Sequence, residues 1–280
     1  MEKTSVKTVI IIILILLNLL LLANLLLNDA YSESVDPAAL EDLSDILGRR
    51  GIEVAEAAFP QKVVRSLPLA VRRSEELEAQ AAARFLGACD AEQLGGGLVS
   101  YSSPAGSATF RQNFGFEINL ENSPFFGANA DDTARRVREA LAEAGFSVES
   151  LEMTAVSDGY GFEAVQKIAG LPVENLVLSG EVGLDGRFAL SGRWVFTYGS
   201  SVDGGRSMPA HSLALPFAEA AVERGYPLGI IEGVSYCYYL NQLSSGEFEI
   251  IPACTFVTDA GIFRVDARKF AFVEFPAAEE

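Results

Sequence analysis

A long apolar run near the N-terminus constrains this chain more than any other feature. The run extends from Val9 to Leu27, VIIIILILLNLLLLANLLL, and only Asn18 and Asn24 interrupt it. About 20 consecutive apolar residues are enough to cross the hydrocarbon core of a bilayer as one helix. The sequence therefore predicts a transmembrane helix over residues 8–28, preceded by a short tail of residues 1–7.

The charges on either side of the run predict its orientation. Lys3 and Lys7 precede it, acidic residues follow it, and no Lys or Arg occurs again before Arg49. Positively charged residues stay preferentially on the cytosolic side of a membrane helix. We therefore expect a single-pass protein of the cell membrane, with its N-terminus in the cytosol and an extracytoplasmic C-terminal domain.

A cleavable signal peptide is the alternative interpretation of the run. The apolar region of a signal peptide is shorter, roughly 7–15 residues, and a small-residue cleavage site follows it. Here the run is longer, and Ala30-Tyr31-Ser32 is the only weak candidate for cleavage. An uncleaved anchor fits the length better.

The two asparagines place polar amides in an apolar helix. Interhelical hydrogen bonds from such side chains are worth about 0.6–2 kcal/mol in a membrane. Asn24 lies six residues after Asn18, about 240° further around a helix, so the two do not share a face. Either Asn24 reaches the interface and Asn18 is merely tolerated, or Asn18 marks a face that docks on another transmembrane helix. Both are candidate partner-binding residues within the membrane.

Composition excludes one class of partner. The 280 residues include 21 Lys+Arg and 38 Asp+Glu, which gives a formal net charge of −17. An acidic ectodomain repels nucleic acid, so we expect no nucleic-acid partner. Without the anchor about 250 residues remain, enough for one large domain or two small ones.

Cysteine and histidine give no sign of a catalytic or metal site. The three cysteines, Cys89, Cys237 and Cys254, show no CxxC spacing. Cys237 and Cys254 lie in apolar, strand-like runs and are expected as buried small hydrophobes, with a Cys237–Cys254 bridge as the alternative. His211 is the only histidine, and we interpret it as a solvated loop residue. We expect no catalytic residue, no metal ligand and no cofactor, and hence no enzyme.

Hydrophobic periodicity and turn signals predict an α+β ectodomain. Four helices are expected, over residues 36–47, 74–86, 131–144 and 214–224. Strands are expected over residues 52–55, 63–64, 69–71, 98–101, 108–114, 116–120, 146–151, 162–165, 176–182, 188–196, 230–231, 234–240, 248–251, 252–257 and 262–267. Alternation puts Tyr236 and Tyr238 on one sheet face, which favours a core or interface position for both.

A helix, a glycine and then a strand recur along the chain. Residues 141–146 (LAEAGF) and 221–226 (AVERGY) are related in this way 80 residues apart, and residues 47–52 (LGRRGI) are a fainter copy. A helix followed by three or four antiparallel strands is an α+β unit in which the helix covers one sheet face. We expect a first α+β unit over residues 29–125 and a second α+β region, with two helix–sheet repeats, over residues 126–280.

Four stretches of the chain share features with one known family. They are the Lys-Thr opening and Leu-Asn pair of residues 7–19; a short helix, Gly-Ile-Glu-Val and a proline in residues 43–60; residues 162–173, with Gln166 and a Gly-Leu-Pro-Val ending; and residues 251–267, IPACTFVTDAGIFRVDA. In these stretches the chain resembles the YycI/YycH family, the membrane-anchored regulators of the WalK (YycG) two-component sensor kinase of Gram-positive bacteria. Cys254 stands where that family usually has Trp, and Asp266 where it often has Asn.

The resemblance implies a non-enzymatic regulator of signal transduction at the cell envelope. Its transmembrane helix would pack against the helices of a membrane sensor histidine kinase, and its ectodomain would pair with a sister regulator of the YycH or YycI type. That implication favours the docking interpretation of Asn18. The alternative, from a different class, is an extracytoplasmic ligand-binding or wall-associated protein with a passive membrane anchor.

Overall fold

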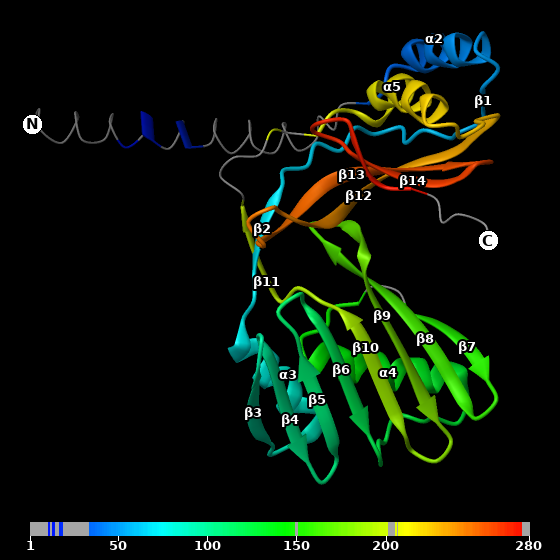
Figure 1. Cartoon of the computed structure of the whole chain (residues 1–280). Coiled ribbons are helices and arrows are strands. Elements are labelled where there is room, and N and C mark those ends of the chain that lie inside the picture. The colour runs from blue at the N-terminus through cyan, green and yellow to red at the C-terminus, as the bar shows by residue number, and fades with distance from the viewer. Residues whose placement is uncertain are drawn as a thin grey trace, which may run out of the picture.

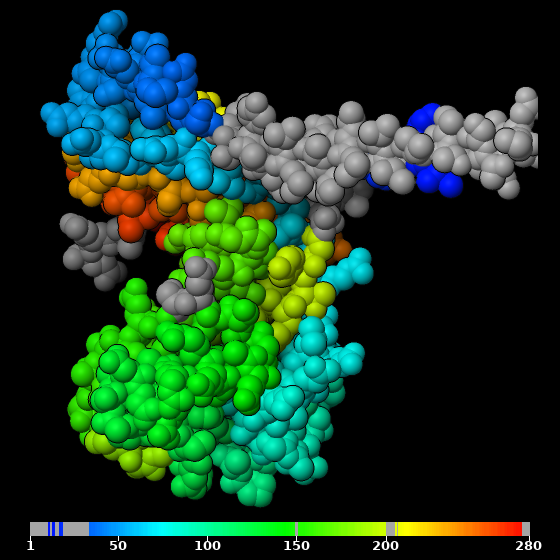
Figure 2. All heavy atoms as spheres, turned by 180° about the vertical axis from the view of Figure 1, so that it is seen from behind, coloured from blue at the N-terminus to red at the C-terminus, as the bar shows by residue number. Residues whose placement is uncertain are grey.

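The computed structural model describes residues 34–148, 151–200, 205 and 207–275, together with Ile11, Ile13, Leu14, Leu17 and Asn18 of the apolar run. Within these residues the fold is α+β, as expected, with four helices and a 15-stranded mixed sheet that runs through two lobes (Figure 1). Seen from behind, the outline of the molecule narrows between the lobes (Figure 2).

The α3/α4 lobe, residues 75–193, is an antiparallel sheet with two helices on one face. Its strand order is β3-β4-β5-β6-β10-β9-β8-β7. The elements are α3 (Glu75–Leu86), α4 (Ala130–Glu143), β3 (Asp90–Gly95), β4 (Leu98–Ser103), β5 (Gly106–Phe110), β6 (Gly115–Leu120), β7 (Glu152–Val156), β8 (Gly159–Ile168), β9 (Leu171–Gly183) and β10 (Phe188–Arg193). The other face of this sheet has no helix over it (Figure 1).

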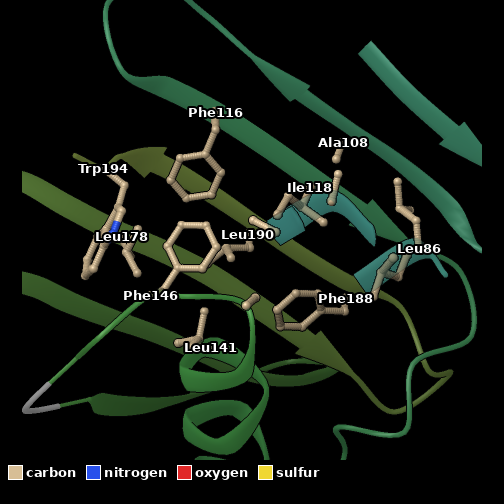
Figure 3. Packing of buried hydrophobic residues seen from close by; sticks show 14 of the residues in the cluster. Leu86, Ala108, Phe116, Ile118, Leu141, Phe146, Leu178, Phe188, Leu190 and Trp194 are labelled. Atoms are coloured by element: carbon tan, nitrogen blue, oxygen red, sulfur yellow. The ribbon is translucent and has the colours of Figure 1, made fainter. Parts of the chain in front are cut away.

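Aromatic side chains fill the core between the sheet and the two helices. The Phe146 ring lies 5.0 Å from Phe116 and 5.3 Å from Trp194, measured between ring centroids (Figure 3). Leu141 reaches the same cluster from α4, and Leu86 reaches it from α3. Alternate strand residues point to opposite faces, so in β4, β5, β6, β8, β9 and β10 one half of the residues lies in this core and the other half lies on the helix-free face.

The α2/α5 lobe, residues 37–72 and 197–274, packs two helices against the rest of the sheet. Its elements are α2 (Pro37–Gly48), α5 (Ala210–Glu223), β1 (Glu53–Val54), β2 (Leu69–Arg72), β11 (Thr197–Ser200), β12 (Ile230–Gln242), β13 (Phe248–Thr258), β14 (Gly261–Asp266) and β15 (Ala271–Glu274). Phe217 of α5 stacks on Phe256 of β13 with ring centroids 4.2 Å apart. The chain turns between Thr258 and Gly261, where β13 and β14 form a hairpin.

Three of the helices begin with a side-chain cap, within two residues of the start that the sequence predicted. The Asp36 carboxylate accepts a hydrogen bond from the N–H of Ala38 at 3.0 Å, and Pro37 occupies the first turn of α2. Ser74 caps α3 in the same way, and Asn129 caps α4. These are the residue types that satisfy the free N–H groups of a helix start.

The fourth helix begins earlier than predicted. The sequence predicted residues 214–224, whereas α5 begins at Ala210 and contains Pro216. The residue before the helix is Pro209, which provides no side-chain cap. The cap comes instead from β12, because the N–H of Ala210 donates a hydrogen bond to the Tyr236 hydroxyl at 3.0 Å. A cap 26 positions away in sequence is invisible to a local pattern.

The recurrent helix–glycine–strand pattern corresponds to one backbone geometry used three times. Gly51, Gly145 and Gly225 have φ of +80°, +86° and +86°. In each copy the next residue donates its N–H to the carbonyl five positions earlier, at 2.8–3.1 Å (residues 52 to 47, 146 to 141 and 226 to 221). Glycine adopts this left-handed conformation without a Cβ penalty, which is why the pattern ends each helix with it.

Some strand predictions are wrong. Residues 63–64 form no strand. Of the described residues in the predicted strand 146–151, which leave out 149 and 150, Val148 alone makes a bridge, to Gln166. Strands β3, β7, β11 and β15 were not predicted, and three of them are short, four or five residues long. All four lie at sheet edges, and β3 and β7 are exposed over nearly all of their length, so burial imposes no alternation on their sequences.

The hydrophobic clusters draw on both sides of residue 125, the expected boundary between units. The core of the α3/α4 lobe contains residues from Ala81 to Trp194, and that of the α2/α5 lobe contains residues from Leu47 to Ala267. From α2 onward the chain thus passes first through the α2/α5 lobe, then forms the α3/α4 lobe, and then completes the α2/α5 lobe. The expected division into units 29–125 and 126–280 stays a prediction.

Candidate functional site

The junction between the two lobes has a hydrophobic core of its own. Residues from both lobes contribute to it, and each is at most 9% exposed. They are Val71, Phe114, Ile168, Val173, Leu176, Val195, Tyr238, Leu240 and Ile250. A shared core of this kind holds two lobes in one orientation, because separating them would expose apolar surface.

Two amide side chains connect the strands at this junction. The Gln166 amide on β8 donates to the carbonyl of Val195 at 2.7 Å and accepts from the N–H of Val195 at 3.0 Å. Asn175 on β9 does the same with both backbone groups of Leu240 on β12, at 2.8 Å each. Each amide therefore makes the pair of hydrogen bonds that the backbone of a neighbouring strand would otherwise make. We call Gln166 and Asn175 the amide clamps.

The sequence did not identify Gln166 or Asn175 as a residue that joins distant parts of the fold. Gln166 belongs to one of the stretches that resemble the YycI/YycH family, yet a glutamine in a strand carries no local signal for a bond to a residue 29 positions away. The sequence around Asn175 likewise carries no local signal for its hydrogen bonds to Leu240. Pairing with a backbone N–H and C=O together is a property of the tertiary fold.

The tyrosines of β12 confirm the expectation of a core position. Tyr236 and Tyr238 are buried, with 8% and 3% of their surface exposed. The hydroxyl of Tyr238 donates to the carbonyl of Leu67 at 3.1 Å, which joins β12 to the segment before β2. Burial raises the pKa of both phenols above the ordinary value.

Charged groups near the junction are paired across strands. Arg264 on β14 contacts Glu174 of β9 at 2.9 Å and Glu274 of β15 at 2.5 Å. Burial pulls the pKa of Arg264 down, and the hydrogen bond and charge of Glu174 more than offset this, so its pKa is raised. Arg268 makes similar contacts with Asp266 and Glu249. Removing one partner of such a pair would leave an uncompensated charge.

His211 does not lie in a solvated loop, so that interpretation is wrong. It occupies the first turn of α5, where it is half-buried, and its Nδ1 has no hydrogen-bond partner among the described residues. The neighbouring Ser207 instead accepts a hydrogen bond from the N–H of Ser66 at 2.8 Å. Within the described residues, no hydrogen bond links His211 to a serine in the way that nucleophile activation requires.

The cysteines are free, and two of them are buried as expected. Cys237 lies opposite Ala253, and Cys254 lies opposite Tyr236. This register puts Cys237 and Cys254 on opposite faces of the sheet, so the alternative of a bridge between them is wrong. Burial raises the pKa of the Cys237 thiol to about 12 and raises that of Cys254 as well. Among the described residues, no three His, Cys, Asp or Glu side chains are grouped to hold a metal ion.

The candidate partner-binding residues Asn18 and Asn24 belong to the apolar run, most of which lies outside the described residues. Asn24 is outside them. Asn18 is helical, and its amide donates to the carbonyl of Leu14 at 3.0 Å. In the part of the chain that the structure describes, no helix has the length and apolar character to span a membrane.

Comparisons with known proteins find only distant similarity. No protein family matches the sequence, and no curated protein matches it either. An uncharacterized protein from Eubacterium rectale is similar in structure over 80% of this chain and 90% of its own, at 11% identity and a TM-score of 0.49. The C-terminal domain of YpeB from Bacillus megaterium is similar over 73% of this chain and 97% of its own, at 9% identity and a TM-score of 0.37. Membership of the YycI/YycH family is not confirmed by these comparisons.

Proposed function

We propose that this chain is a non-enzymatic regulator, of the YycI/YycH type, of a membrane sensor histidine kinase. It acts through helix–helix contacts in the bilayer and through its extracytoplasmic domain, which pairs with a sister regulator. The observation that carries the proposal is a polar amide, Asn18, in the middle of the apolar run Val9 to Leu27.

The hydrogen bonding of Asn18 supports a docking role. One N–H of its amide is used within the chain, on the carbonyl of Leu14. A carboxamide has a second N–H and an oxygen acceptor, and neither has a hydrogen bond to the described residues. In hydrocarbon such groups need a partner, and a polar group on a neighbouring transmembrane helix supplies one.

The lobe junction supports a role in interaction rather than in chemistry. The shared core and the amide clamps join the lobes into one body, so a contact made anywhere on the ectodomain bears on the whole domain.

Photo-crosslinking in native membranes tests the transmembrane contact. A photoreactive residue replaces Leu14 in the full chain, and mass spectrometry identifies the captured protein. We expect a histidine kinase, and we expect Asn18→Leu to reduce its capture about 3- to 30-fold, the factor that corresponds to one interhelical hydrogen bond. Asn24→Leu tests the second candidate residue and should have a smaller effect, because position 24 is nearer the end of the apolar run. Capture of no kinase, or equal capture with Asn18→Leu, contradicts the proposal.

The second candidate function is an extracytoplasmic ligand-binding protein with a passive anchor. The observation that favours it is the hollow on the helix-free sheet face described below. Replacing residues 1–28 by an unrelated membrane anchor separates the two candidates. A regulator that acts through the bilayer loses its effect on the kinase, whereas a passively anchored binding protein keeps its activity.

A further inference from the structure

The helix-free face of the α3/α4 lobe contains a continuous trough. Two adjoining cavities of about 480 and 390 Å³ lie on it and share Glu181 and Ala189 as lining residues. The smaller cavity is floored by Gly161, Ser179 and Ser191, whose small side chains leave the sheet surface accessible. Figure 1 shows this face toward the viewer, with α3 and α4 behind the strands.

An arginine lies beyond one end of the trough. Ser191 and Arg193 point to the same face of β10, two residues apart, so Arg193 lies about 7 Å past the lining residue Ser191. The Arg193 side chain is half-buried, and its Nε donates one hydrogen bond, to the carbonyl of Asn113 at 3.3 Å. Burial lowers the pKa of this guanidinium, since its charged form loses hydration.

Arg193 differs in its partners from the other arginines that are withdrawn from solvent. Arg73, Arg264 and Arg268 each contact at least one carboxylate within 3.4 Å. No carboxylate among the described residues lies within salt-bridge distance of Arg193. A half-buried arginine with no carboxylate partner among the described residues is unusual, because an uncompensated charge is costly to bury. An anionic group of a ligand would supply the missing counter-charge.

The walls of the trough have the opposite charge. Glu152 of β7 lies directly opposite Glu163 of β8, and Glu181 lies on the next strand. Like charges directly across a strand pair destabilise a sheet, and no basic residue of the described chain forms an ion pair with these three carboxylates. A cationic group placed between them would relieve the repulsion.

We propose that the trough binds an extended peptide that ends in a free carboxylate, with the carboxylate on Arg193 and a basic side chain near Glu163 and Glu181. Glu181 is paired with Ala189, which is four residues from Arg193 along β10, about 13 Å. An extended peptide spans that distance with about four residues. The ligand therefore carries its basic residue four positions before its C-terminal residue. This binding is independent of the proposed kinase contact.

Fluorescence anisotropy with the full chain in nanodiscs tests the proposal. The probe is a fluorescein-labelled peptide, Lys-Ala-Ala-Ala-Ala, as the free acid and as the C-terminal amide. We expect the free acid to bind at least about tenfold more tightly than the amide, since a charge-assisted bond to the guanidinium is lost on amidation. In Arg193→Met the two peptides should bind equally, and in Arg193→Lys part of the preference should remain. Replacing the lysine of the probe by glutamate should abolish binding.

Arg138→Met is the matched control. Arg138 is exposed on α4, on the opposite side of the sheet, and its removal changes the net charge by the same amount. Emission of Trp194, next to the altered residue, reports whether Arg193→Met keeps its fold. Absence of binding at millimolar peptide, equal affinity for acid and amide, or an equal loss in Arg138→Met overturns the proposal.

Discussion

The amide clamp at Gln166 provides a direct test of how the lobes are joined. Gln166→Met keeps the length of the side chain and removes its donor and acceptor. The N–H and the C=O of Val195 then lose their partners at 3.0 and 2.7 Å, in a place where Val195 is 1% exposed and Gln166 is 4% exposed. Water cannot replace these bonds without opening the junction.

The expected loss of stability follows from the number of unpaired groups. Each buried backbone group left without a partner costs about 1–3 kcal/mol, so two cost about 2–6 kcal/mol. Methionine is easier to bury than glutamine, which offsets about 1–2 kcal/mol. Taking the middle of each range, we expect the free energy of unfolding of Gln166→Met to fall by about 2.5 kcal/mol.

Two measurements check this expectation. Urea denaturation is followed by the emission of Trp194, the only tryptophan, which directly precedes the clamped residue Val195. Hydrogen exchange by mass spectrometry reports the amide of Val195, which should exchange at least about 30-fold faster if 2 kcal/mol of local protection is lost. Gln112→Met is the control, because Gln112 is exposed, and it should change stability by less than about 0.5 kcal/mol. Equal behaviour of the two variants would refute the reasoning.

Three further perturbations have defined outcomes. Glu78→Gln breaks the buried ion pair with Arg73, whose guanidinium lies 2.7 Å from the carboxylate, and should lower the unfolding free energy by about 3–5 kcal/mol in urea denaturation. Gly145→Ala should cost about 1–2 kcal/mol because φ is +86° there, whereas Gly48→Ala, in a helix with open space around it, should stabilise by about 0.4–1 kcal/mol; the same sign for both would contradict the backbone argument. Burial raises the pKa of Cys237 to about 12, so the stability it contributes is complete below the ordinary thiol pKa of about 8.5 and is lost as pH rises toward 12. Between pH 9 and 11 the unfolding free energy of the native chain should therefore fall more steeply with pH than that of Cys237→Ala. The difference between the two slopes should be about 1.4 kcal/mol per pH unit, and equal slopes would argue against the buried thiol.

Local chemistry made much of the secondary structure predictable. Asp36 before Pro37, and Gly145 after an amphipathic stripe, each specify a helix end through contacts within a few residues. The hairpin around Gly261 is likewise a short-range feature. These elements follow from the sequence because every partner in the capping or turn geometry is a sequence neighbour.

The arrangement of the lobes and the site residues follow from long-range contacts. Tyr236 caps α5, and Gln166 and Asn175 pair with backbone 29 and 65 positions away. The separation of Cys237 from Cys254 depends on the register of β12 against β13, and β13 shows no alternation that would specify it because the strand is buried on both faces. That no carboxylate of the described residues pairs with Arg193 is visible only once the fold is known.

The junction also limits how a ligand in the trough can act. The trough lies on the α3/α4 lobe, whereas the chain reaches that lobe from α2, the first helix after the apolar run (Figure 1). Because a nine-residue core and two amide clamps lie between the lobes, a ligand would have to overcome several kcal/mol to rotate one lobe against the other. A short peptide held mainly by one carboxylate does not provide that differential energy. Its effect on a partner would instead come from occupying or exposing a surface of a domain that moves as one body.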